Sequence, residues 1–144
     1  MIEQDTVKLL RECDAGVKMG TAALDEVLPH VKNSTLKSIL SECKRQHNQL
    51  QDELQKRLDA MQDEGKKPNP IAKGMSWMKT NVLLGMEESD ATVADLITDG
   101  CNMGVKSLSC YLNKYVAADE KSKDIAKRLI KLEAQLSEDL RAYL

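Results

Sequence analysis

The sequence has few aromatic residues and few residues that break helices. Only 3% of its 144 residues are aromatic, and Phe is absent. It also contains only 7 Gly and 3 Pro, so turns are few and the regular elements are long. A β-sandwich or barrel needs frequent turns and β-prone aromatic residues. The composition therefore argues against both and favours an all-helical protein.

Other absences bear on partners and location. No stretch of about 18 apolar residues is present, so we expect no membrane span. The N-terminal residues Met1–Asp5 are acidic and lack the apolar run of a signal peptide. The net charge of −2 disfavours the broad basic surface that binds nucleic acid. We therefore expect a cytoplasmic protein that binds neither membranes nor nucleic acid.

The cysteines form no C-x-x-C pair, which disfavours zinc-ribbon and thioredoxin-type redox sites. Each falls within a helical pattern, and we interpret all four as reduced thiols that act as small core hydrophobes. They are Cys13, Cys43, Cys101 and Cys110.

What the sequence does contain is helical periodicity. Apolar and small residues recur at spacings of three and four, which predicts helices over about residues 3–28, 35–64, 91–116 and 119–144. A shorter helix is expected from residue 70 or 71 to residue 86. We therefore predict one domain over residues 1–144, made of a hairpin at 3–64, a crossover at 65–89 and a second hairpin at 90–144.

The two predicted hairpins look like copies of each other. Gly16–Gly20 and Gly100–Gly104 share the pattern Gly-x-x-Met-Gly at an offset of 84 residues. The second and fourth helices match at an offset of 86 residues, which places His47 on Glu133. Two antiparallel hairpins joined by one long crossover have the topology of a ferritin-like four-helix bundle.

Four glycines lie inside the predicted helices, where each costs roughly 1 kcal/mol relative to Ala. Their small-x-x-x-small spacing favours a close crossing of the first and third helices, glycine face to glycine face. A cavity kept open for a ligand or ion is the alternative. The crossing residues are Gly16, Gly20, Gly100 and Gly104.

His47 lies on the inner stripe of its helix, where a ferritin-like di-metal protein carries Glu-x-x-His. Here Lys44 stands three residues before His47, so that motif is broken. We therefore expect no metal or other cofactor, and a structural contact between His47 and Glu133 across the core. The alternative is a weak Fe, Mn or Zn site formed by Glu12, His47 and Glu133.

No motif predicts a catalytic residue. His30, the other histidine, lies in an expected turn beside Pro29, and no glycine-rich loop connects a strand to a helix. The sequence therefore favours no enzyme activity.

The crossover segment has apolar residues on more than one face, which indicates burial on more than one face. Either it packs beneath the bundle or its outer face binds a second chain, and Met and Trp are common on such surfaces. We expect a homodimer built partly on this segment, through Met75, Trp77, Met78 and Leu84.

Taken together, these features resemble an uncharacterised group of small bacterial ferritin-like proteins, related to ferritin-like domains of unknown function. The resemblance runs from about Val7 to Leu144 and implies the bundle fold and a cytoplasmic location, but no activity. The residues that support it are Met19-Gly20, Val27-Leu28-Pro29, Asp99-Gly100, Met103-Gly104, Arg128–Glu133 and Tyr143-Leu144.

Two functional hypotheses follow. The first is a non-catalytic helical module that acts through self-association or a protein partner. The second is a degenerate ferritin-like protein that binds metal or acts as an oxidoreductase, and it rests mainly on analogy of fold.

Overall fold

The computed structural model describes residues 2–61, 63 and 89–144, and within them the chain forms helices and no strand. The all-helical prediction is confirmed for this part of the chain. The helix expected from residue 70 or 71 to 86 lies outside it. The helices are α1 (Ile2–Val27), α2 (Ser34–Ala60), α4 (Asp90–Lys114) and α5 (Glu120–Asp139), with short 3₁₀ helices at Leu28–His30 and Leu140–Tyr143.

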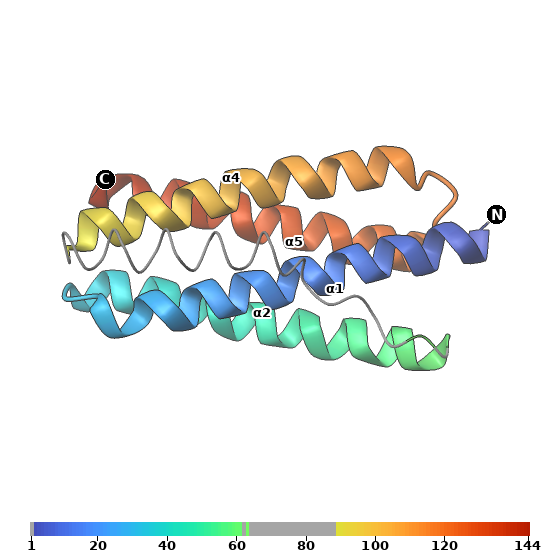
Figure 1. Cartoon of the computed structure of the whole chain (residues 1–144), viewed down its shortest axis with the longest axis horizontal. Helices are drawn as coiled ribbons and strands as arrows, with labels where there is room; N and C mark the ends of the chain where they lie inside the picture. The colour runs from blue at the N-terminus through green and yellow to red at the C-terminus, as the bar shows by residue number, and fades with distance from the viewer. Residues whose placement is uncertain (1, 62, 64–88) are drawn as a thin grey trace.

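The four long helices pack together as a bundle of two hairpins (Figure 1). α1 packs most extensively on α2, and α4 packs most extensively on α5. α1 also contacts α4 and α5, and α2 contacts α5, so the two hairpins share one interior. Figure 1 shows the α1–α2 turn and the α4–α5 loop at opposite ends of the bundle.

Side-chain caps fix where three helices begin. The cap satisfies one of the backbone N–H groups that have no partner inside the helix. Asn33 caps α2 by accepting from the Leu36 N–H at 3.0 Å, and Ser89 caps α4 by accepting from the Thr92 N–H at 3.1 Å. Asp119 caps α5 by accepting from the Ser122 N–H at 2.8 Å.

The end of α2 differs from the sequence prediction. The helix ends at Ala60 rather than at residue 64, with Met61 as its C-cap. The Asp63 N–H donates to the Leu58 carbonyl at 2.9 Å, which closes the last turn before Gly65 is reached. Backbone hydrogen bonds from Met61 and Asp63 therefore close the end of this helix.

Polar contacts tie the two hairpins together at both ends. At one end, the Asp90 carboxylate accepts from the backbone N–H groups of Lys32 at 2.8 Å and Asn33 at 3.0 Å. At the other end, Asp5 accepts from the Ala117 N–H at 3.0 Å. Thr6 Oγ1 accepts from the Asp119 N–H at 2.8 Å beside it. The start of each hairpin is therefore hydrogen-bonded to the segment that joins the two helices of the other hairpin.

The interior contains two separate apolar clusters. The first is centred on Leu9, Leu54, Leu58, Leu108 and Leu129. The second is centred on Leu24, Leu40, Ile97, Leu136 and Leu140. Each cluster draws buried residues from all four long helices. Along α5, Leu129 lies in the first cluster and Leu136 in the second, so the residue buried between them occupies the middle of the bundle.

In the part of the chain that the structure describes, no helix has the length and apolar character needed to cross a bilayer.

Candidate functional site: a polar layer at the centre of the bundle

The buried residue between the two clusters on α5 is Glu133, and it faces His47 on α2. Glu133 Oε1 lies 3.7 Å from His47 Nε2. His47 is 2% exposed and Glu133 is 7% exposed, so both are core residues. The predicted contact between these two side chains across the core is confirmed.

The second ring nitrogen of His47 is held by its own helix. Nδ1 lies 2.8 Å from the carbonyl oxygen of Cys43 and 3.5 Å from the Cys43 thiol sulfur. Because a carbonyl oxygen only accepts, Nδ1 carries a proton and donates it there. Nε2 faces the carboxyl group of Glu133.

Burial and charge act together on the titration of this site. Burial alone lowers the pKa of His47, but its contacts with Cys43 and Glu133 outweigh burial and raise that pKa to about 10. Burial raises the pKa of Glu133, and the neighbouring His47 only partly offsets this. Burial, then the charge of Glu133, raise the pKa of the Cys101 thiol to about 12. His47, Glu133 and Cys101 therefore keep their protons to higher pH than the same side chains do in water.

Glycines on α1 and α4 make room for this pair. A Cβ built on Gly20 would lie 2.9 Å from His47 Nε2, and one built on Gly104 would overlap Glu133 Oε2 and lie 2.8 Å from its Cδ. One residue from each long helix thus forms a layer between the apolar clusters. This polar layer consists of Gly20, His47, Gly104 and Glu133.

The polar layer agrees with the internal repeat. The offset of 84 residues relates Gly20 to Gly104, and the offset of 86 relates His47 to Glu133. In both hairpins, the glycine of the first helix accommodates the polar residue of the second. The two hairpins therefore share this contact as well as a sequence pattern.

The predicted glycine-to-glycine crossing needs correction. Next to a Cβ on Gly20 or Gly104, the nearest atoms belong to the side chains of His47 and Glu133, not to the backbone of another helix. Gly16 would meet only Leu129, at 4.0 Å. Gly100 is exposed, and a Cβ there would meet nothing within 4 Å. Two of the four glycines therefore fit core side chains, and Gly100 does not lie in the core.

The alternative metal set is not brought together. Glu12 lies eight residues, or about 12 Å along α1, before Gly20. It lines a small surface groove with Lys8, Arg11 and Tyr115. Among the described residues, no group of three His, Cys, Asp or Glu side chains has the geometry to hold a metal ion. The predicted interface residues Met75, Trp77, Met78 and Leu84 lie outside the described residues.

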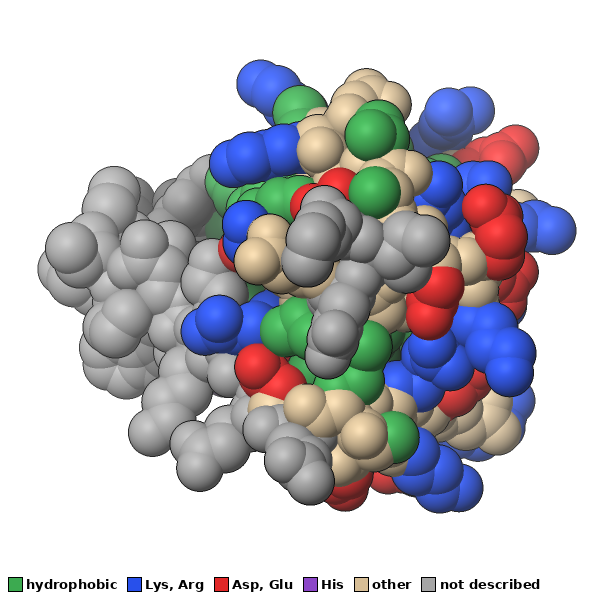
Figure 2. Space-filling model, turned by 90° about the vertical axis from the view of Figure 1, so that its right-hand side faces the viewer, with side chains coloured by type: hydrophobic (Ala, Val, Ile, Leu, Met, Phe, Trp, Pro, Cys, Tyr) green, Lys and Arg blue, Asp and Glu red, His purple; other side chains and the backbone are tan. Residues whose placement is uncertain are grey.

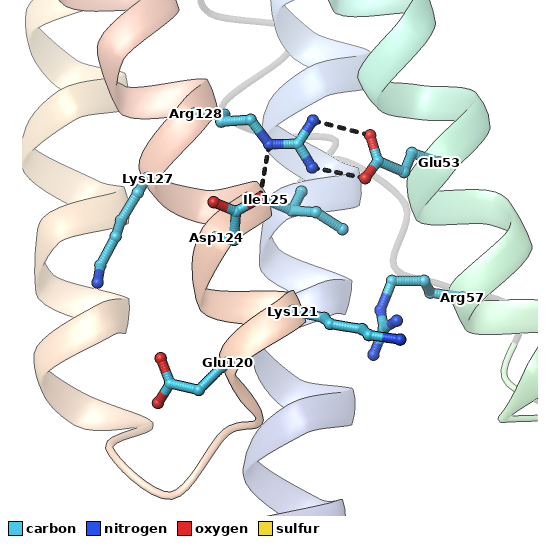
Figure 3. A pocket seen from close by; sticks show the side chains of 8 residues that line it. All are labelled: Glu53, Arg57, Glu120, Lys121, Asp124, Ile125, Lys127 and Arg128. Atoms are coloured by element: carbon cyan, nitrogen blue, oxygen red, sulfur yellow. Dashed lines mark hydrogen bonds and ion pairs between the residues drawn. The ribbon is translucent and has the colours of Figure 1, made fainter.

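A charged groove between α2 and α5 was not predicted from the sequence. It has a volume of about 450 Å³ (Figure 3). Arg128 forms a two-pronged ion pair with Glu53, with N–O distances of 2.9 and 2.5 Å, and also contacts Asp124 at 2.9 Å. Arg57 pairs with Asp119 at 2.8 Å. Figure 3 shows the pair of Arg128 and Glu53 bridging the two helices.

The groove has no dominant charge. Its lining contains acidic and basic side chains in similar number, and its principal arginines already contact carboxylates. Figure 2, which views the end of the bundle where α4 connects to α5, shows Lys, Arg, Asp and Glu side chains intermixed over its right-hand side. The polar periodicity of α2 and α5 indicated an exposed face, but the pairing depends on the register of two helices distant in sequence.

α4 carries an open face outside the core. Met103 is 65% exposed, although it lies in the middle of the helix. Gly100 precedes it by one turn and is also exposed. In the second copy of the Gly-x-x-Met-Gly pattern, Gly100 and Met103 are the two residues that lie outside the core, whereas Gly104 accommodates Glu133.

No family model, curated protein or solved structure matches the chain.

Proposed function

We propose that this chain is a non-catalytic helical module that acts by associating with protein, either a second copy of itself or another partner. The open face of α4 is the observation that supports this proposal. A glycine inside a helix costs about 1 kcal/mol relative to Ala, and among the described residues no atom within 4 Å of a Cβ built on Gly100 explains that cost. Close approach of another helix would offset it, because a glycine lets two backbones come together.

Met103 adds an anchor to this face. Flexible methionine side chains fit many partner shapes and are enriched at protein interfaces. By contrast, His47 and Glu133 contact each other in the interior, where a substrate has no access without opening the bundle. The accessible chemistry of the described bundle thus favours recognition of protein over catalysis.

The proposal includes a fold relationship and a location. We propose that the bundle is ferritin-like, because its polar layer takes one residue from each of four helices at mid-bundle, as ferritin-like metal centres do. The four free cysteines support a reducing cytoplasm, where such thiols persist.

Light scattering across 5–200 µM tests the association directly. We expect a mass above the 16.1 kDa of one chain, with Met103→Glu lowering it towards one chain. Val116→Glu is the matched control, because Val116 is also 65% exposed but lies outside the long helices. A monomer at every concentration would reject self-association. Equal loss with both variants would show that the open face of α4 has no special role.

Weak metal binding is the second candidate. Glu133 Oε2 is buried without a hydrogen-bond partner beside His47, which is an unusual state for a carboxyl oxygen. Metal analysis of chain purified without chelator or affinity tag separates the candidates. Near-stoichiometric Fe, Mn or Zn that is lost with His47→Ala would favour this function over protein association.

A further inference from the structure

The α4–α5 hairpin has one stretch of surface with basic side chains and no exposed acidic side chain. Residues 102–114 of α4 contain no Asp or Glu. Residues 125–137 of α5 contain one acidic residue, Glu133, which is buried against His47. We call the exposed part of these two segments the basic surface. Its basic residues, all of them exposed, are Lys106, Lys114, Lys127, Arg128 and Lys131.

The two segments lie side by side. α4 and α5 are antiparallel, so residues later in α4 are beside residues earlier in α5 (Figure 1). The Ser137 hydroxyl donates to Asn102 Oδ1 at 3.5 Å, which fixes the register of the two helices. Lys106 and Lys131 therefore lie within about one turn of the same level of the bundle. Each segment is about 18 Å long, from a rise of 1.5 Å per residue.

Most cations of the basic surface are not neutralised by carboxylates of the chain. Arg128 is the exception, because it contacts Glu53 and Asp124 on the side of α5 that faces α2. Asp99 and Glu138 lie just beyond one end of the surface. The members that form no ion pair with another described residue are Lys106, Lys114, Lys127 and Lys131.

This surface does not follow from the overall charge of the chain. The chain contains 23 acidic and 21 basic residues and has a net charge of −2. Lysines gathered on one face repel one another in the free chain, and a partner of opposite charge relieves that repulsion. Such a patch also steers the approach of the partner and fixes its orientation. The basic surface is therefore complementary to an acidic partner.

The other side chains of the surface favour a protein over a nucleic acid or a membrane. Bases of single-stranded nucleic acid stack on exposed aromatic rings. The one aromatic residue of the two segments, Tyr111, is half-buried and stacks on Tyr115. A helix that lies in a membrane surface needs a broad apolar face. Here Met103 is the one large apolar side chain that is exposed, and it neighbours Lys106 on α4.

We propose that the basic surface of α4 and α5 binds an acidic segment of a partner protein. Lys106, Lys127 and Lys131 face carboxylates of that segment, and Met103 contacts an apolar side chain between them. This inference rests on the proposed function and names the chemistry of the partner. It places the contact on α4 and α5, whereas the sequence prediction placed the interface on residues 75–84.

A labelled peptide tests the surface. The probe is a peptide of about 20 residues made of Glu with one central Leu, titrated with the full chain and followed by fluorescence anisotropy. We expect saturable binding that weakens as salt is added, because exposed charges are screened. Lys106→Glu combined with Lys131→Glu reverses one charge on each helix. We expect this double variant to raise the dissociation constant at least about tenfold at low salt.

Lys8→Glu combined with Lys37→Glu is the matched control. It makes the same change in net charge at exposed positions of α1 and α2. We expect it to leave the dissociation constant within about twofold of the original. Circular dichroism shows that both double variants remain helical. Met103→Ala tests the apolar contact, and we expect it to weaken binding of this peptide but not of a peptide made of Glu alone.

Three results would overturn the inference. The first is no saturable binding of the peptide at about 1 mM chain, since a complementary surface binds more tightly than this at low salt. The second is equal loss of binding with both double variants. The third is tighter binding of an oligothymidine, or of vesicles of phosphatidylserine and phosphatidylcholine, that is lost with Lys106→Glu and Lys131→Glu. None of these results alters the self-association measured by light scattering, so a failure here is distinguishable from a failure of the proposed function.

Discussion

The glycines of this protein have different physical roles although they share one motif. Gly104 is required by the side chain of Glu133, which occupies the space of its missing Cβ. A Cβ built on Gly100, one turn earlier on the same helix, would meet no atom of another helix within 4 Å. The same residue type therefore serves the polar layer at one position and the open face at the other.

The two positions make a matched stability test. At Gly104, a methyl group displaces a buried carboxyl group from His47, so we expect Gly104→Ala to lower the free energy of unfolding by about 1–3 kcal/mol. At Gly100, the same change meets open space and gains helix propensity, so we expect a rise of about 0.5–1 kcal/mol. Urea unfolding followed by circular dichroism measures both. Two changes of the same sign would contradict the assignment of these glycines.

The His47–Glu133 pair makes stability depend on pH. The pKa of His47 is about 10 in the folded chain and about 6.5 when unfolded. Between these values the folded chain keeps a proton that the unfolded chain has released, so the free energy of unfolding falls as pH rises. A difference of one bound proton changes the free energy of unfolding by about 1.4 kcal/mol per pH unit. The raised pKa of Glu133 acts in the same direction.

Glu133→Gln tests this effect, because it removes the carboxylate that, together with Cys43, raises the pKa of His47. We expect the free energy of unfolding of the original chain to fall more steeply than that of the variant between pH 7 and 8.5. The buried thiols add a decline at higher pH, since Cys13 and Cys101 have pKa values of about 12. Parallel curves for the two chains in this window would contradict a raised pKa at His47.

At the scale of single elements, sequence patterns predicted most of what is observed. The apolar stripes located four helices, and Asn33 and Asp119 cap two of them, as residues of these types commonly do. The His47–Glu133 contact was also predictable, because each residue interrupts an apolar stripe at the same place in the repeat. The reason for Gly20 and Gly104 was not predictable from the sequence. Which side chain occupies the space beside a glycine depends on how the packed helices are rotated about their axes.

Contacts between helices distant in sequence were the least predictable. The pairing of Arg128 with Glu53 requires the register of α5 against α2, which no local pattern specifies. Asp90 likewise lies in the first turn of α4, where an acidic residue is expected from the helix dipole alone. Its bonds to Lys32 and Asn33 become visible only when the hairpins are placed together.

Asp90 is therefore expected to stabilise the contact between hairpins as well as its own helix. Asp90→Ala removes a charged acceptor from two backbone N–H groups, and we expect a loss of about 1.5–3 kcal/mol. Asp95→Ala, on the exposed side of the same helix, is the control and should change the free energy of unfolding by less than about 0.5 kcal/mol. Thermal or urea unfolding gives both values, and equal losses would show that Asp90 acts only through its helix.

For the whole molecule, we expect the polar layer to determine how the hairpins align. A polar layer inside an apolar bundle disfavours shifted packings, which would leave His47 or Glu133 against apolar neighbours. Gly100 and Met103 lie exposed on α4, and this face is the surface through which we propose that the chain associates.

The measurement that tests this account most directly is the mass of the chain in solution, measured by sedimentation equilibrium from 5 to 200 µM. We predict a weight-average mass that rises with concentration above the 16.1 kDa of one chain, and a smaller rise for Met103→Glu. A mass of one chain at every concentration would contradict self-association.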